Sequence, residues 1–103
     1  IFIGRCADYV LRDNPRCVNV FITANMEDRI ASVMKWNNCT AEKAQEIIEK
    51  GDSERASFYN FYSSGTWGAA STYHLCINSS VLGIEETAVL IKNFVIQKLN
   101  LPQ

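Results

Sequence analysis

The sequence predicts an α/β fold in which a parallel β-sheet is covered by helices on both faces. Short apolar runs typical of buried strands occur at Ile1–Ile3, Val18–Ile22 and Leu75–Ile77. Segments with helical spacing of apolar residues separate these runs, and this alternation is the pattern of a parallel sheet with helical crossovers. Because such crossovers are right-handed, the carboxyl ends of the strands are expected at one edge, where such sheets bind ligands.

The first half of the chain contains the signals for two helices. Gly4-Arg5 ends the first predicted strand, and a short helix is expected over Cys6–Leu11, before a turn at Asp13–Pro15. Asn25 follows the second strand as the expected N-cap of the next helix. The apolar stripe predicted for that helix consists of Ile30, Val33 and Met34.

The second half contains two further helical patterns. Thr40 is expected to cap a helix with a stripe of Ala44, Ile47 and Ile48. Gly51 interrupts this pattern and is expected to end or kink the helix, and Ser63–Thr66 is expected to be a loop. Gly83 marks the start of a last helix that continues to Leu99. Its predicted core-facing stripe is Ile84, Ala88, Ile91 and Val95.

The composition excludes several kinds of partner. Ten basic and eleven acidic residues give a net charge of −1, so no overall field attracts nucleic acid or an anionic membrane. No apolar run approaches the length of a membrane span, roughly 18 residues, and no signal peptide is recognisable. The cysteines are widely spaced without a C-x-x-C pair, which argues against a zinc site and favours reduced thiols in a cytoplasmic protein; they are Cys6, Cys17, Cys39 and Cys76.

The chain opens within the apolar run Ile1–Ile3 and lacks an initial methionine. A natural protein rarely begins inside a strand. We therefore expect residues 1–103 to be the C-terminal part of a single longer domain, with about three strands of its sheet.

Polar and aromatic side chains between residues 52 and 67 indicate a binding site. Asp52 and Arg55 are three positions apart and share one helical face, where an acid and an arginine can orient a phosphate or a sugar hydroxyl. The alternative is an ordinary solvated ion pair. Tyr59, Tyr62 and Trp67 are expected to pack in the interior, with contact to a nucleobase as the alternative, whereas His74 has no partner at catalytic or metal-binding spacing.

Several motifs occur in the order found in one enzyme family. They are Ile3-Gly4-Arg5, Val20-Phe21-Ile22-x-Ala24-x-x-Glu27-Asp28-Arg29, Asp52-x-x-Arg55, Trp67-Gly68, and Ile77-Asn78-Ser79-Ser80 before Ile84-Glu85-Glu86. With these motifs the chain resembles the cytidylate-kinase-like members of the P-loop nucleoside monophosphate kinases. The resemblance implies a three-layer, P-loop-NTPase-type sheet and a lid-like helical segment near residues 36–62.

The resemblance also implies roles for individual residues. Arg5 would bind the nucleoside monophosphate, Arg29 would belong to the helix that enters the lid, and Asp52 and Arg55 would close over phosphates or sugar. The residues expected near the adenine of ATP are Ser79, Ser80, Val81 and Leu82. The implied activity is transfer of the γ-phosphate of ATP, with Mg²⁺, to a nucleoside monophosphate, with CMP as the leading acceptor. Small-molecule nucleotides are then the expected partners, and no oligomeric state is indicated.

The chain departs from the family pattern at three positions and lacks one motif. Thr23 stands where bacterial cytidylate kinases have aspartate, which affects the expected base preference. Ser32 and Val33 stand where those enzymes have further lid arginines. No G-x-x-x-x-G-K-[ST] loop occurs in residues 1–103, so the phosphate-binding loop would precede Ile1.

Competing interpretations follow from these departures. Fewer lid arginines favour a non-catalytic nucleotide-binding or regulatory protein on the same fold, whereas the presence of Arg5, Asp52 and Arg55 favours an enzyme. Arg5 could alternatively pair with a carboxylate near Asp8, and Arg29 with nearby acids. A self-contained interaction module is disfavoured by the expected start within a strand.

Overall fold

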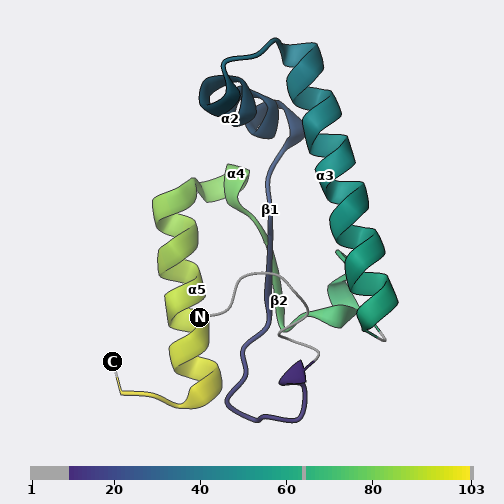
Figure 1. Ribbon diagram of the computed structural model, residues 1–103. Helices are drawn as coiled ribbons and strands as arrows, with labels where there is room; N and C mark the ends of the chain where they lie inside the picture. Colours follow the sequence, from purple (N-terminus) through teal and green to yellow (C-terminus); the bar gives the residue numbers. More distant parts are fainter. Residues whose placement is uncertain (1–9, 64, 103) are drawn as a thin grey trace.

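The computed structural model describes residues 10–63 and 65–102. Strands β1 (Val20–Thr23) and β2 (Leu75–Asn78) form a two-stranded parallel sheet. Figure 1 shows this pair in the centre of the molecule, with long helices on either side of it. The parallel pairing predicted for these two segments is confirmed, and the fold is α/β.

Several predicted features fall outside the described part of the chain: the strand Ile1–Ile3, Arg5 and most of the helix Cys6–Leu11. Within it, β1 begins later than the predicted Val18 and ends at Thr23. The backbone N–H of Asn19 donates to Nδ1 of His74 at 2.8 Å. Because a side chain takes this donor, the regular strand ladder starts one residue later, at Val20.

Helix α2 (Met26–Asn37) follows β1. Asn25 occupies the N-cap position with extended backbone angles, as predicted, but its side chain makes no capping hydrogen bond. Its Oδ1 instead accepts a hydrogen bond from Nδ2 of Asn78 at 2.8 Å. The helix ends at Asn38, whose φ of 50° is a left-handed conformation that asparagine tolerates well.

Helix α3 (Ala41–Tyr62) is the longest helix, at 22 residues. Oγ1 of Thr40 accepts from the backbone N–H of Lys43 at 3.2 Å, so the predicted cap is confirmed. A helix end at Gly51, one of the two expected effects of this glycine, is wrong, because α3 continues through this position. A glycine inside a helix costs only about 1 kcal/mol relative to alanine, and the burial of Ala44 and Ile48 holds the helix in place.

The last third of the chain contains the helical turn η1 (Ala70–Thr72), α4 (Ser79–Leu82) and α5 (Ile84–Leu99). The residues expected near the adenine of ATP, 79–82, form the single turn α4 directly after β2. It forms because Oδ1 of Asn78 accepts from the N–H of Ser80 at 2.9 Å and caps the turn. Gly83 then separates α4 from α5 with a φ of 86°.

An aromatic cluster joins α3 to the sheet. The ring of Phe21 lies 5.3 Å from that of Trp67 in an edge-to-face arrangement and 4.9 Å from that of Tyr73. Tyr59 of α3 is 8% exposed, and its ring lies 6.4 Å from that of Tyr73. Packing roles are therefore confirmed for Tyr59 and Trp67, whereas Tyr62 is 58% exposed and contacts rings of its own helix.

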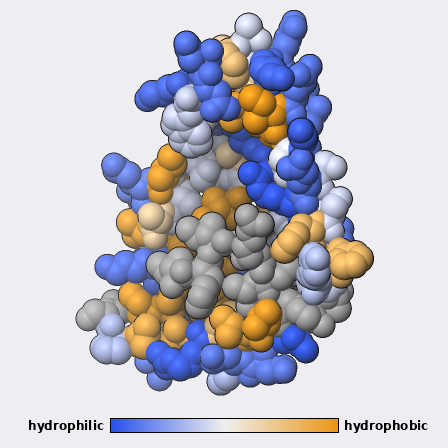
Figure 2. Space-filling model, viewed as in Figure 1, coloured by the Kyte–Doolittle hydropathy of each residue, from blue (hydrophilic) through white to orange (hydrophobic). Residues whose placement is uncertain are grey.

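The N-terminal half of α5 is more exposed than its sequence predicts. Ile84 is 82% exposed and Ala88 is also exposed, whereas Ile91 and Val95 are half-buried. Strands of four residues span only about 13 Å, whereas a helix of sixteen residues spans about 24 Å. The described strands therefore cannot cover the whole helix. Figure 2 shows hydrophobic side chains on this side of the molecule.

Within residues 10–63 and 65–102, no helix combines the length and the apolar composition that a membrane-spanning helix needs.

Candidate functional site

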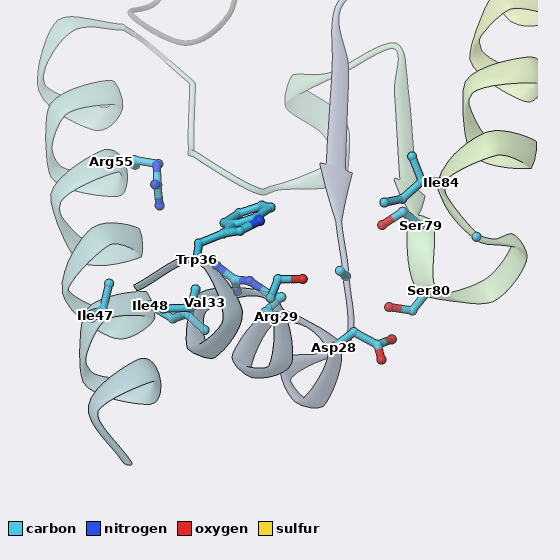
Figure 3. Close-up of a pocket in the computed structure, with 13 residues that line it drawn as sticks. Asp28, Arg29, Val33, Trp36, Ile47, Ile48, Arg55, Ser79, Ser80 and Ile84 are labelled. Atoms are coloured by element: carbon cyan, nitrogen blue, oxygen red, sulfur yellow. The ribbon is translucent and has the colours of Figure 1, made fainter. Parts of the chain in front are cut away.

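A cavity of about 600 Å³ lies between α2, α3 and the turn from β2 into α4. Arg29, Ser32 and Trp36 line it from α2, Arg55 from α3, and Ser79 from α4. Figure 3 shows Arg29, Trp36, Arg55 and Ser79 around a common space, with Arg55 directed inward from its helix. The cavity thus lies at the carboxyl ends of both described strands, where a parallel sheet positions its ligands.

Asp52 joins the two arginines of this cavity. Its Oδ1 accepts from Nη2 of Arg29 at 2.7 Å and from Nη1 of Arg55 at 3.2 Å. The side chains of Arg29 and Asp52 are each 28% exposed, whereas that of Arg55 is 63% exposed. The pair between α2 and α3 is therefore the better shielded of the two, and the pair within α3 is close to solvent.

The charges of this group do not cancel. One carboxylate faces two guanidinium groups, each of which carries five N–H donors, so Arg29 and Arg55 retain donors beyond those used by Asp52. Guanidinium groups bind phosphate through short, charge-assisted hydrogen bonds. Asp52 can therefore hold both arginines in orientations from which they bind an anion in the cavity.

Gly51 gives Arg55 room to adopt its position. A Cβ atom at Gly51 would lie 3.1 Å from Nη1 of Arg55, which is closer than normal van der Waals contact. The guanidinium group of Arg55 thus lies over the bare backbone of the preceding helical turn. Gly51, where an interruption of the helix was expected, instead has no side chain that would displace the guanidinium group of Arg55.

Hydrogen bonds tie the two strand ends together below the cavity. Oγ of Ser79 donates to the carbonyl oxygen of Thr23 at 3.1 Å, and Oγ of Ser80 accepts from the backbone N–H of Asn25 at 2.9 Å. Together with the bond between Asn78 and Asn25, these contacts fix α4 against the start of α2. Ser80 still has a hydroxyl proton and Ser79 still has lone pairs to offer a ligand.

The structure brings most of the predicted site residues together. Arg29, Arg55, Ser79 and Ser80 line the cavity, and Asp52 bonds to both arginines at its wall. Val81 and Leu82 do not line it and are 74% and 52% exposed. Arg5 lies outside the described residues.

Sequence reasoning did not identify Trp36 or Asp28 as cavity residues. Trp36 follows Arg29 by seven positions and Val33 by three, so the three residues share one face of a helix. That spacing was available in the sequence. Because Trp36 is the second-last residue of α2, however, it fell within the predicted lid segment and received no separate role.

His74 has a structural position, as its isolation in sequence indicated. Its Nδ1 accepts from the backbone N–H of Asn19, and its own N–H donates to the carbonyl oxygen of Asn19 at 2.8 Å. Partial desolvation lowers the pKa of His74 below its ordinary value of 6.5, and the positive charge of Lys98 lowers this pKa further. The imidazole is therefore neutral at physiological pH, with its proton on Nε2.

The chain was compared with protein families, solved structures and curated proteins. A family model described as the cytidylate kinase-like family matches residues 1–81. The fold is similar to that in the crystal structure of an uncharacterized protein from Eubacterium ventriosum ATCC 27560, with 28% sequence identity and a TM-score of 0.89. That similarity covers 91% of this chain and 52% of the other, so this chain spans about half the length of its structural relative. A search of curated proteins found no match.

Proposed function

Because the chain belongs to the cytidylate kinase-like family, we propose that it contributes the lid and part of the nucleotide site of an enzyme that transfers phosphoryl groups. The proposed reaction moves the γ-phosphate of ATP to a nucleoside monophosphate, with CMP as the leading acceptor. The observation that carries the proposal is the convergence of Arg29 and Arg55 on Asp52 at the wall of one cavity.

Catalysis of this transfer depends on positioned cations. An oxygen of the acceptor phosphate forms a bond to the γ-phosphorus of ATP while the bond to the β–γ bridging oxygen breaks, which yields ADP and a nucleoside diphosphate. Negative charge spreads over the transferred group in the transition state, and arginines at fixed positions stabilise it. In this proposal Arg29 and Arg55 supply that charge, and Asp52 orients both side chains.

The residues present fit the phosphates of ATP better than they fit its metal. Arg29 and Arg55 can bind phosphate oxygens, and Ser79 and Ser80 have hydroxyl groups at the cavity wall. In the parts of the chain that the structure describes, no cluster of three or more histidine, cysteine, aspartate or glutamate side chains could hold a metal ion. Magnesium needs only one or two carboxylates in addition to nucleotide phosphates, so the metal in this proposal is held mainly by ATP.

The proposal extends to the architecture of the whole domain. We infer that residues 1–103 form the C-terminal part of a three-layer domain of the P-loop type, with the lid near residues 36–62. In that arrangement Arg5 lies near the acceptor nucleotide, and Ser79, Ser80, Val81 and Leu82 lie near the adenine. A cytoplasmic location and small-molecule nucleotide partners belong to the same proposal.

A second function is supported by a specific observation. Ser32 and Val33 stand at positions where the family resemblance implies arginines, and both line the cavity. A cavity with fewer cations can bind a nucleotide without accelerating transfer. The alternative is therefore a non-catalytic nucleotide-binding or regulatory protein on the same fold.

A coupled assay of the full-length protein separates these functions. ATP and Mg²⁺ are supplied with CMP, UMP, dCMP or AMP in turn, and ADP formation is followed. The kinase proposal expects turnover with at least one acceptor, CMP first, and predicts CDP as the second product. ATP binding measured by calorimetry, without turnover on any acceptor, would favour the binding protein instead.

A further inference from the structure

Trp36 is an exposed aromatic side chain on the wall of a cavity that contains cationic groups. It is 78% exposed, yet it lines the same cavity as Arg29 and Arg55. Within residues 10–63 and 65–102, its ring contacts no other aromatic ring. Trp67, in contrast, packs edge to face on Phe21. The two tryptophans of the chain therefore have different roles, and only that of Trp67 is explained by packing.

One face of α2 presents a cation and a flat aromatic ring at its two ends. Arg29, Val33 and Trp36 follow one another at helical spacing, and all three line the cavity. Seven positions along a helix separate Arg29 from Trp36 by about 10 Å. The face thus offers an anion-binding group at one end, an apolar surface in the middle and a ring at the other end.

The residues on the other walls of the cavity also suit a ligand that combines an anionic group with a flat ring. Figure 3 shows the indole ring of Trp36 projecting away from α2 into the space below Arg55. Asp28 is the acidic side chain of the lining, and Figure 3 shows it on the side of Ser80, away from Arg55. The positive groups and the ring thus share one part of the cavity, and the acidic group occupies another.

We propose that Trp36 is a stacking platform for the base of a nucleotide whose phosphates reach Arg29 and Arg55. This inference rests on the proposed nucleotide chemistry of the cavity and adds a binding residue to it. A nucleobase has a flat π face that stacks on tryptophan, and its phosphates pair with guanidinium groups. The base can belong to ATP or to the acceptor, and the two are distinguished by experiment.

Binding titrations of the full-length protein test the inference. ATP and CMP are titrated by calorimetry into the natural protein and into its Trp36→Ala and Trp36→Phe variants. Loss of one stacked base is expected to weaken binding of the affected nucleotide roughly ten- to a hundredfold in Trp36→Ala, whereas Trp36→Phe retains most of the affinity. Tripolyphosphate and ribose 5-phosphate, which lack a base, should bind all three proteins equally well. The inference would be overturned if the natural protein and both variants bound ATP with the same affinity and also bound CMP with the same affinity.

Fluorescence provides a readout that a general structural role would not produce. Stacking of a base on Trp36 should quench tryptophan emission during the titration. The quenching should persist in the control variant Trp67→Phe and disappear in Trp36→Phe. Quenching of equal size in Trp36→Phe would overturn the inference.

The outcome for Trp36 can be separated from the outcome for the proposed kinase. Turnover of CMP with an unchanged affinity in Trp36→Ala would reject the platform and keep the enzyme. Trp36-dependent binding without turnover would keep the platform and favour a binding protein. An absence of ATP and CMP binding in the natural protein would reject both.

Discussion

Arg29 of α2 and Asp52 of α3 lie 23 positions apart in the sequence, and their side chains meet at 2.7 Å between Nη2 and Oδ1. The same Asp52 oxygen accepts from Arg55 one helical turn later. Asp52 is therefore both a link between two helices and the common partner of two cationic groups that line the cavity. Substitution of Asp52 should therefore affect both the contact between the helices and the orientation of the two arginines.

Asp52→Asn should lower both stability and activity. The amide is nearly the same size but carries no charge and has only one oxygen acceptor. Loss of the charged hydrogen bonds, in a partly exposed setting, should reduce the free energy of unfolding by about 1–2 kcal/mol. Urea denaturation measures this loss, with the exposed Glu54→Gln on the same helix as the control. A loss of equal size in both variants would show that the link between α2 and α3 adds no stability.

Arg55→Ala should reduce kcat far more than it reduces stability. The side chain is 63% exposed, and its bond to Asp52 is a surface pair within one helix, so less than about 1 kcal/mol of folding free energy depends on it. An arginine that meets charge developing in the transition state can contribute about 10³-fold to phosphoryl transfer. Steady-state kinetics with ATP and CMP, together with thermal unfolding, would measure the two effects. A fall in melting temperature with unchanged kcat would contradict the proposed role.

Gly51→Ala should stabilise α3 and impair the cavity. Alanine is favoured over glycine inside a helix by about 0.5–1 kcal/mol, and the group in its way is the flexible end of Arg55. The guanidinium must therefore move while the helix becomes more stable. We expect a higher melting temperature together with weaker binding of ATP or CMP. A matched exchange to alanine at exposed Ser53 of the same helix should leave binding unchanged.

His74 should make stability fall as the solution becomes acidic. Its pKa is lower in the folded protein than the unfolded value of 6.5, so the unfolded chain binds more protons. Stability from the neutral imidazole is fully present above pH 6.5 and is lost as pH falls through the folded pKa. Protonation also removes the acceptor that Nδ1 provides to the N–H of Asn19.

Thermal unfolding between pH 7.5 and pH 5.5 would measure this dependence. In His74→Asn, the amide oxygen can stand in for Nδ1 and does not titrate, so the decrease with falling pH should be smaller. An identical pH profile in the natural protein and the variant would show that another group is responsible.

The fold could be predicted wherever one local signal determined it. Apolar runs located β1 and β2, and Thr40 located the start of α3, because a strand pattern and a capping side chain act over a few residues. The continuation of α3 through Gly51 could not be predicted from the glycine itself. It depends on packing of α3 against α2, which outweighs a local propensity of about 1 kcal/mol.

Individual residues of the candidate site could be predicted from the sequence, but the way these residues are arranged in space could not. The pairing of Asp52 with Arg55 is expected from a separation of three positions in a helix. Its pairing with Arg29 requires α2 and α3 to lie side by side, which no local pattern in the sequence specifies. Trp36 has the spacing of a cavity residue, but only the fold shows that its face of α2 borders a cavity.

The pairing of Val20 with Leu75 has a consequence for how the chain folds. These partners in the strand ladder are 55 positions apart, 75 minus 20, and all of α2 and α3 lies between them. Closing so long a loop has an entropic cost that the short ladder can offset only after the intervening helices are in place. We therefore expect α2 and α3 to associate first and the strands to join late. Amide hydrogens of Phe21 and Ile77, which face the partner strand in this register, should accordingly acquire protection from exchange after those of Ala44 and Ile48 during refolding.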